Sequence, residues 1–155
     1  MMNIEDMLEK EFIIENLKSR TKKEVLIELS DVFMNSITAV NRDSLIEVLL
    51  EREKLGSTGI GEGIAIPHGK LAGLEKLVIS FGRSMTGVDF DSLDGNPVYI
   101  FFLILAPENS AGQHLKALAK ISRMLKDVSF RESLMNIKTS EEAYNLIIEK
   151  SKTYV

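Results

Sequence analysis

Residues 56–69 of this 155-residue chain read GSTGIGEGIAIPHG, and the predicted fold is built outward from this segment. Its first half carries glycines at positions 56, 59, 61 and 63, which are too dense for the interior of a helix. Three apolar residues, Ile64-Ala65-Ile66, follow and predict a short strand that meets Pro67-His68-Gly69. The segment therefore predicts a glycine-rich loop that enters a strand, with His68 at the strand end between a stiff residue and a small one.

Two helices are predicted before this segment. Thr21 and Glu24 have the spacing of a capping box, and the apolar residues after them recur on one helical face. Asn41 or Ser44 can cap a second helix, which we expect to end at the first glycine of the segment. Arg52 falls in the last turn of that helix, where a cation suits the helix dipole.

Strands and then helices are predicted after the segment. The strands are expected at 77–81, 88–90 and 98–105, and the last of them lies in the longest apolar run of the chain. Three helices close the chain, with expected caps at Ser110, at a Ser129/Glu132 box and at a Thr139/Glu142 box. This order predicts an α/β fold in which a mixed β-sheet is sandwiched between helices. Residues 1–155 are expected to form a single domain, because no repeat or long linker divides them.

The composition excludes several classes of function. The formal net charge is −4, so the chain lacks the basic character that non-specific nucleic-acid binding needs. Cysteine is absent, which excludes disulfides, thiolate nucleophiles and cysteine-ligated metals. The longest apolar run, 98–106, is about half of a membrane span, so no direct membrane insertion is expected. Because the N-terminus mixes acids with apolar residues and does not resemble a secretory signal, a cytoplasmic location is expected.

Neither a nucleotide nor a metal site is predicted. The residues around Gly69-Lys70 lack the spacing of a Walker A loop, with Ile64 where its first glycine would stand. Gly59 and Gly61 are not followed by a third glycine at the dinucleotide spacing, since that position is again Ile64. The two histidines stand far apart and lack the spacing of a zinc site. We therefore expect no cofactor and no bound metal.

Histidine chemistry remains, and it must use His68, His114 or both. Taken singly, each candidate also has a structural interpretation. His68 can be a strand-end histidine bonded to a loop, and His114 can satisfy a backbone carbonyl from the apolar face of a helix. Arg52 can be an ordinary solvated charge at a helix end.

Taken together, these residues indicate phosphoryl transfer. A neutral imidazole is a good nucleophile near pH 7, and arginine offers a fork of donors to phosphate oxygens. An adjacent guanidinium also favours the uncharged form of the histidine. Backbone N–H groups and the hydroxyls of Ser57 and Thr58 could form a phosphate-contacting loop. The second imidazole could orient the first or contact the phosphoryl group.

The run from Arg52 to Lys70 resembles the signature of type-2 enzyme IIA domains of the bacterial phosphoenolpyruvate:sugar phosphotransferase system. This fructose/mannitol class includes the nitrogen-regulatory IIA proteins, and the resemblance continues through 89–95, 101–107 and 113–115. It implies that His68 receives a phosphoryl group through Nε2 from the phosphocarrier HPr and passes it to a cysteine of a IIB domain. It also implies that Arg52 is the active-site arginine and His114 the second histidine. Because the chain has no cysteine, the IIB acceptor is expected to be a separate molecule.

Two functions fit this resemblance. The sequences FGRS at 81–84 and DSLDG at 91–95 look more like fructose-specific IIA domains, and they favour a phosphoryl carrier in fructose-type sugar uptake. The sequence PHGKL at 67–71 looks more like the nitrogen-regulatory branch, in which the phosphorylation state of the histidine controls binding to regulatory partners. We expect the sugar carrier, with the regulatory protein as the alternative; a module of a larger transporter or regulator is a third possibility.

Overall fold

The centre of the fold is the strand β6 (Val98–Pro107), in a computed structural model that describes residues 2–154. β6 pairs antiparallel with β5 (Val78–Val88) and parallel with β3 (Ile64–Ala65) and β4 (His68–Leu71). All but two of its ten residues are buried, which explains the long apolar run in the sequence. Three strands pair with β6 directly, and the other two join the sheet through β5 and β3.

The residues that follow the glycine-rich loop lie along one edge of β6 as two strands, β3 and β4, placed end to end. Ala65 of β3 stands opposite Phe101, and His68 of β4 stands opposite Ile104. Pro67 separates the two strands, and its carbonyl accepts a hydrogen bond from the Ile104 N–H. The bond to the Pro67 carbonyl and the pairing of β4 with β6 therefore fix the backbone of His68 against the central strand.

Two short strands complete a six-stranded mixed sheet. β1 (Ile13–Ile14) runs parallel to β5, and β2 (Gly59–Gly61) runs antiparallel to β3. The sheet order is β1-β5-β6-β3-β2, and β4 pairs with β6 on the same edge as β3, farther along the strand. The mixed sheet expected from the sequence is confirmed.

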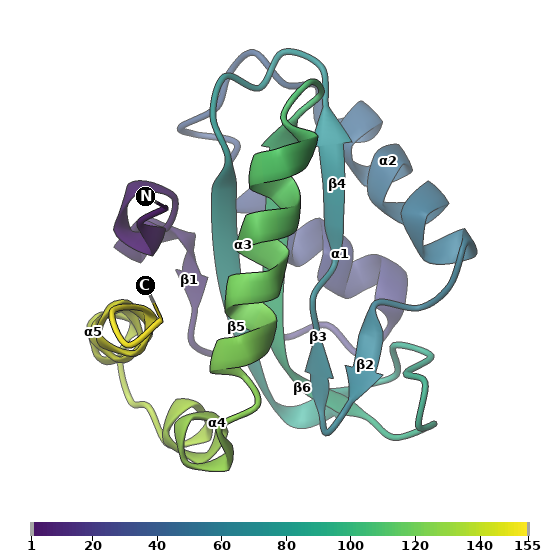
Figure 1. Cartoon of the computed structure of the whole chain (residues 1–155). Coiled ribbons are helices and arrows are strands. Elements are labelled where there is room, and N and C mark those ends of the chain that lie inside the picture. Colours follow the sequence, from purple (N-terminus) through teal and green to yellow (C-terminus); the bar gives the residue numbers. More distant parts are fainter. Residues whose placement is uncertain (1, 155) are drawn as a thin grey trace.

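Helices cover both faces of this sheet (Figure 1). α3 lies in front of it, while α1 and α2 lie behind it; α4 and α5 follow α3 beside β1 and the lower end of the sheet. The helices are α1 (Lys22–Asp31), α2 (Arg42–Lys54), α3 (Ala111–Met124), α4 (Val128–Met135) and α5 (Ser140–Ser151), with two 3₁₀ turns at Ile4–Asp6 and Lys10–Phe12. None of the helices in residues 2–154 has the length and apolar character needed to cross a membrane.

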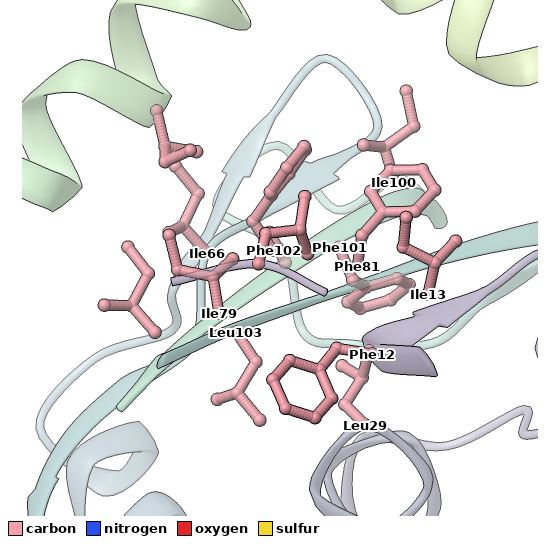
Figure 2. Close-up of a cluster of buried hydrophobic side chains, with 14 of the residues drawn as sticks. Phe12, Ile13, Leu29, Ile66, Ile79, Phe81, Ile100, Phe101, Phe102 and Leu103 are labelled. Atoms are coloured by element: carbon pink, nitrogen blue, oxygen red, sulfur yellow. The ribbon is translucent and has the colours of Figure 1, made fainter. Parts of the chain in front are cut away.

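The main core lies where β5 and β6 meet the first helix and the N-terminal turns. Phe12 and Leu29 lie on the α1 side of the two strands in Figure 2, whereas the register pair Phe81 and Phe102 points to the opposite face of the sheet. Phe81 and Phe102 pack edge to face with ring centroids 5.0 Å apart, and all four side chains are buried. Edge-to-face aromatic packing adds to the burial of apolar area and makes this part of the sheet a rigid support.

The predicted helix caps are confirmed in part. The Thr21 and Thr139 side chains accept the expected bonds from the third residue of each helix, and Asn41, not Ser44, caps α2. Ser110 holds the N-cap position of α3, but its hydroxyl donates to the Pro107 carbonyl and caps nothing.

The predicted Ser129/Glu132 box is wrong. α4 begins two residues earlier than that box requires, because the Asp127 carboxylate accepts bonds from the Ser129 and Phe130 N–H groups. A carboxylate at the N-cap also complements the positive end of the helix dipole.

The predicted strands are correct in their centres and wrong at their ends. β5 runs on to Val88, so the separate strand expected at 88–90 does not form. The extension buries Arg83, whose guanidinium donates to the carbonyls of Glu15, Met135 and Ile137 and can therefore lie inside the protein. His68 was expected to end the strand before it, but it begins β4.

Candidate functional site

His68 stands at the first position of β4 with its ring half-buried. Its Nδ1 lies 2.9 Å from the Ile66 carbonyl oxygen. Because a carbonyl can only accept, this contact places the ring proton on Nδ1. The lone pair is then on Nε2, the nitrogen that faces away from the strand backbone.

Arg52 reaches that second nitrogen from the last turn of α2. Its Nε–H donates to His68 Nε2 over 3.3 Å, and its Nη1 donates to the Gly56 carbonyl over 2.9 Å. Gly56 has a φ of +145°, a backbone conformation that side-chain-bearing residues rarely adopt, and the chain turns there out of the helix. The turn that ends α2 thus anchors the guanidinium and aims it at the imidazole.

His114 brings the second imidazole to the site from the first turns of α3. The two histidine rings pack edge to face, with centroids 5.1 Å apart and an interplanar angle of 71°. His114 is buried, and its Nδ1 is the one buried side-chain nitrogen or oxygen in residues 2–154 without a hydrogen-bond partner. An unpaired lone pair costs less than an unpaired N–H, so the ring proton is assigned to Nε2.

Both imidazoles are kept uncharged by their surroundings. Burial lowers the pKa of His68, and the positive charge of Arg52 lowers it further, against the opposing effects of the Ile66 carbonyl and the Glu53 carboxylate. Burial also lowers the pKa of His114, with smaller contributions from His68 and Lys70. At pH 7 His68 is therefore a neutral imidazole with its lone pair on Nε2, which is the nucleophilic form.

Ser57 and Thr58 lie in the turn beside the site, and each hydroxyl has a partner within the protein. The Ser57 hydroxyl donates to the Phe90 carbonyl and accepts from the Gly59 N–H. The buried Thr58 hydroxyl donates to the Glu53 carboxylate over 2.5 Å. Both hydroxyls hold the turn in place, and the contact with phosphate expected from the sequence stays a prediction.

The structure thus brings three of the five sequence-predicted residues into direct contact, namely Arg52, His68 and His114. Two further groups belong to the site and were not predicted: the Ile66 carbonyl and the Glu53 carboxylate. The only sequence signal for Glu53 is its position next to Arg52. A neutral imidazole with an adjacent guanidinium and a second imidazole suits a protein that carries a phosphoryl group on a histidine.

Comparison with known proteins identifies the class. Residues 6–150 match the family model described as "Phosphoenolpyruvate-dependent sugar phosphotransferase system, EIIA 2". The chain belongs to this family, and the class expected from the residues around His68 is confirmed. It is an EIIA component of the phosphotransferase system, a phosphohistidine phosphotransfer protein.

Nitrogen-regulatory and fructose-specific proteins are both among the relatives similar over most of the chain. A nitrogen regulatory protein of Bradyrhizobium diazoefficiens is 43% identical over 146 residues, which cover 94% of this chain and 95% of that protein. A fructose-specific EIIABC component of the phosphotransferase system of Bacillus subtilis is 38% identical over 151 residues, which are 97% of this chain and 24% of that protein. Among solved structures, nitrogen regulatory protein IIA-Ntr of Neisseria meningitidis superposes with a TM-score of 0.85 at 36% identity, covering 92% of this chain and 97% of that one.

Proposed function

We propose that Nε2 of His68 is the atom that carries the phosphoryl group, received from phosphorylated HPr. The observation that supports this most strongly is the pair of contacts on one ring, with the Ile66 carbonyl at Nδ1 and Arg52 at Nε2. The first keeps the proton on Nδ1 and the second places a cation beside the reacting nitrogen. The P–N bond of the donor breaks as the P–Nε2 bond forms, and the electron pair of the broken bond returns to the donor nitrogen.

Arg52 and His114 then act on the transferred group. As the phosphoryl group takes the lone pair of Nε2, the Arg52 Nε–H is freed to donate to a phosphoryl oxygen. The His114 Nε2–H can donate to another oxygen, since its ring lies against that of His68. Two donors and one positive charge would compensate the roughly two negative charges of the phosphoryl group.

Of the two branches, we infer the nitrogen-regulatory one, in which the phosphorylation state of His68 controls binding to regulatory partners. The sequence motifs alone favour the fructose carrier. The full-length similarity to nitrogen regulatory proteins, 43% over 94% of the chain, supports the alternative better. The structural similarity to IIA-Ntr points the same way.

Fructose-type sugar uptake is the second candidate function. It is favoured by the 38% identity to the fructose-specific EIIABC component and requires a IIB cysteine as acceptor. These 155 residues hold no cysteine, so that acceptor would lie outside them.

Phosphorylation with phosphoenolpyruvate, enzyme I and HPr tests the assignment of His68. We expect one acid-labile phosphoryl group per chain, lost in His68→Ala and retained in His114→Ala. Phosphorylation of His68→Ala would overturn the assignment. Adding a fructose-type IIB protein then separates the branches: the regulatory function predicts that the phosphoryl group stays on this protein, whereas transport predicts its movement to the IIB cysteine.

A further inference from the structure

Glu53 is a buried carboxylate that the proposed phosphoryl transfer does not use. Its side chain is 4% exposed, although it stands on the last turn of a surface helix. One carboxylate oxygen accepts from the Thr58 N–H over 3.1 Å and lies 3.2 Å from Lys22 Nζ of α1; the other accepts from the Thr58 hydroxyl. A charge taken out of water at this depth is stable only because all of these partners are present.

The contacts of Glu53 continue, one hydrogen bond at a time, to the reactive histidine. Thr58, held through both its N–H and its hydroxyl, accepts a bond at its carbonyl from the Ile66 N–H over 3.1 Å. The carbonyl of the same Ile66 accepts the proton of His68 Nδ1 over 2.9 Å. The position of the acceptor that selects the His68 tautomer therefore depends on where Glu53 holds Thr58.

Glu53 also neighbours the group on the opposite side of the ring. Arg52 precedes it in the same helical turn, and the Glu53 carbonyl accepts the N–H of Gly56, whose own carbonyl anchors the guanidinium. Both nitrogens of the imidazole are thus supported from the end of α2, one through Arg52 and one through Thr58 and Ile66.

We propose that Glu53 is a positioning residue for phosphoryl transfer, which holds Thr58 and Ile66 so that His68 keeps its proton on Nδ1 and its lone pair on Nε2. This inference rests on the assignment of His68 as the phosphoryl acceptor. It also gives the Thr58 hydroxyl a role different from the phosphate contact expected from the sequence. Lys22 is the counter-ion that allows the carboxylate to be buried, so it also helps to hold Glu53 in this position.

The test uses variants that change one contact at a time. Glu53→Gln removes the charge with little change of shape, and Thr58→Val removes the hydroxyl while keeping the backbone and the volume. Thr58→Ser restores the hydroxyl and serves as the conservative rescue. Glu51→Gln is the matched control, since Glu51 is an exposed glutamate of the same helix that is also paired with a lysine, Lys54.

Two measurements are made on each full-length variant. ¹⁵N-labelled histidine reports which ring nitrogen carries the proton, and with only two histidines in the chain His68→Ala assigns the spectrum. The rate of phosphorylation by phospho-HPr is measured at 25 °C, after amide spectra and thermal unfolding have shown that each variant is folded. A loss of stability alone would change neither the tautomer nor the rate of the folded fraction.

In Glu53→Gln and Thr58→Val, we expect a mixture of His68 tautomers and a phosphorylation rate about tenfold or more below that of the wild type, with KM for phospho-HPr within twofold. Thr58→Ser and Glu51→Gln should keep the wild-type tautomer and rate. An unchanged tautomer in both Glu53→Gln and Thr58→Val would overturn the proposal, whether or not the rate falls. If the wild type accepts no phosphoryl group, the proposed function fails, while the tautomer still decides the role of Glu53.

Discussion

Arg52→Ala removes the group that contacts the reactive nitrogen of His68, and its effect can be worked out from the geometry. In the unphosphorylated protein the Arg52 Nε–H lies 3.3 Å from Nε2, so after transfer the same donor faces the phosphoryl oxygens. A charge-assisted hydrogen bond contributes about 1.5–3 kcal/mol, and the partial exposure of Arg52 favours the lower end, about 1.5–2 kcal/mol. At about 1.4 kcal/mol per factor of ten, the phosphorylation rate should fall about 10- to 30-fold.

The pH dependence should change as well. The positive charge of Arg52 is one of the causes that lower the pKa of His68, after burial. Without that charge the pKa rises, and more of the ring is protonated and non-nucleophilic at acid pH. The acid limb of the rate profile should therefore move to higher pH in Arg52→Ala, while the plateau falls.

The assay is quenched-flow phosphorylation by phospho-HPr between pH 5 and 8, with Lys54→Ala as the control. Lys54 is an exposed cation in the same helical turn, so its removal changes the net charge equally but leaves the site intact. Both variants should stay folded: Lys54→Ala loses an exposed ion pair and should unfold within about 1 kcal/mol of the wild type, and Arg52→Ala also loses the bond to the Gly56 carbonyl, worth about 0.5–1.5 kcal/mol. Equal rates and superimposable profiles for Arg52→Ala and Lys54→Ala would refute the role of Arg52.

Two further substitutions test the neighbouring elements. His114→Gln should still be phosphorylated but should pass on or retain the group less well, so the lifetime of the phosphohistidine is measured; a lifetime equal to that of the wild type would return His114 to a structural role. Gly69→Ala places a Cβ 2.9 Å from Val48 Cγ1, so either this side chain or α2, which carries both Val48 and Arg52, must shift. It should cost about 1–3 kcal/mol of unfolding free energy and slow phosphorylation several-fold. The control Gly112→Ala has open space around its new Cβ and should leave the rate unchanged and stability equal or higher; equal behaviour of the two variants would contradict the packing argument.

Local signals in the sequence predicted most of the helices and the central strand. Capping at Thr21 and Thr139 needs only a hydroxyl three residues before a free N–H, and both ends of that bond are visible in the sequence. The apolar run of β6 is visible for the same reason, because a strand buried on both faces has no polar alternation.

The shorter strands carry no such signal. β1 and β3 have two residues each and β2 has three, too few for any periodicity to appear. β1 and β3 form because β5 and β6 present unpaired backbone groups to them, and β2 forms on the open edge of β3; these pairings are tertiary effects. The cap of α4 was mistaken because Asp127 and Ser129 are both good N-cap residues, and only packing decides between them.

The groups of the site also divide into those that the sequence alone reveals and those that depend on the tertiary structure. The side chains of Arg52, His68 and His114 could be singled out because each residue type has its own chemistry. The Ile66 carbonyl could not, because every residue carries a carbonyl and only the break between β3 and β4 brings this one to Nδ1. The partner of the Thr58 hydroxyl could not be predicted either, since a carboxylate and a phosphate oxygen are equivalent acceptors for it.

The neighbouring positions of Arg52 and Glu53 explain why the signature in the sequence is continuous although few of its side chains do chemistry. Successive residues of a helix point about 100° apart, so one turn of α2 can send a cation to His68 and an anion toward Lys22 and the loop. After this turn the chain passes through Gly56 to Gly63 and enters β3. The path puts the Thr58 N–H on the Glu53 carboxylate and the Ile66 N–H on the Thr58 carbonyl. An insertion between Glu53 and Thr58 would move Thr58 away from the carboxylate that holds it. The hydrogen bonds between Arg52 and His68 therefore depend on one another. The number of residues in this run matters to the site as well as the side chains, because it sets where Thr58 and His68 lie.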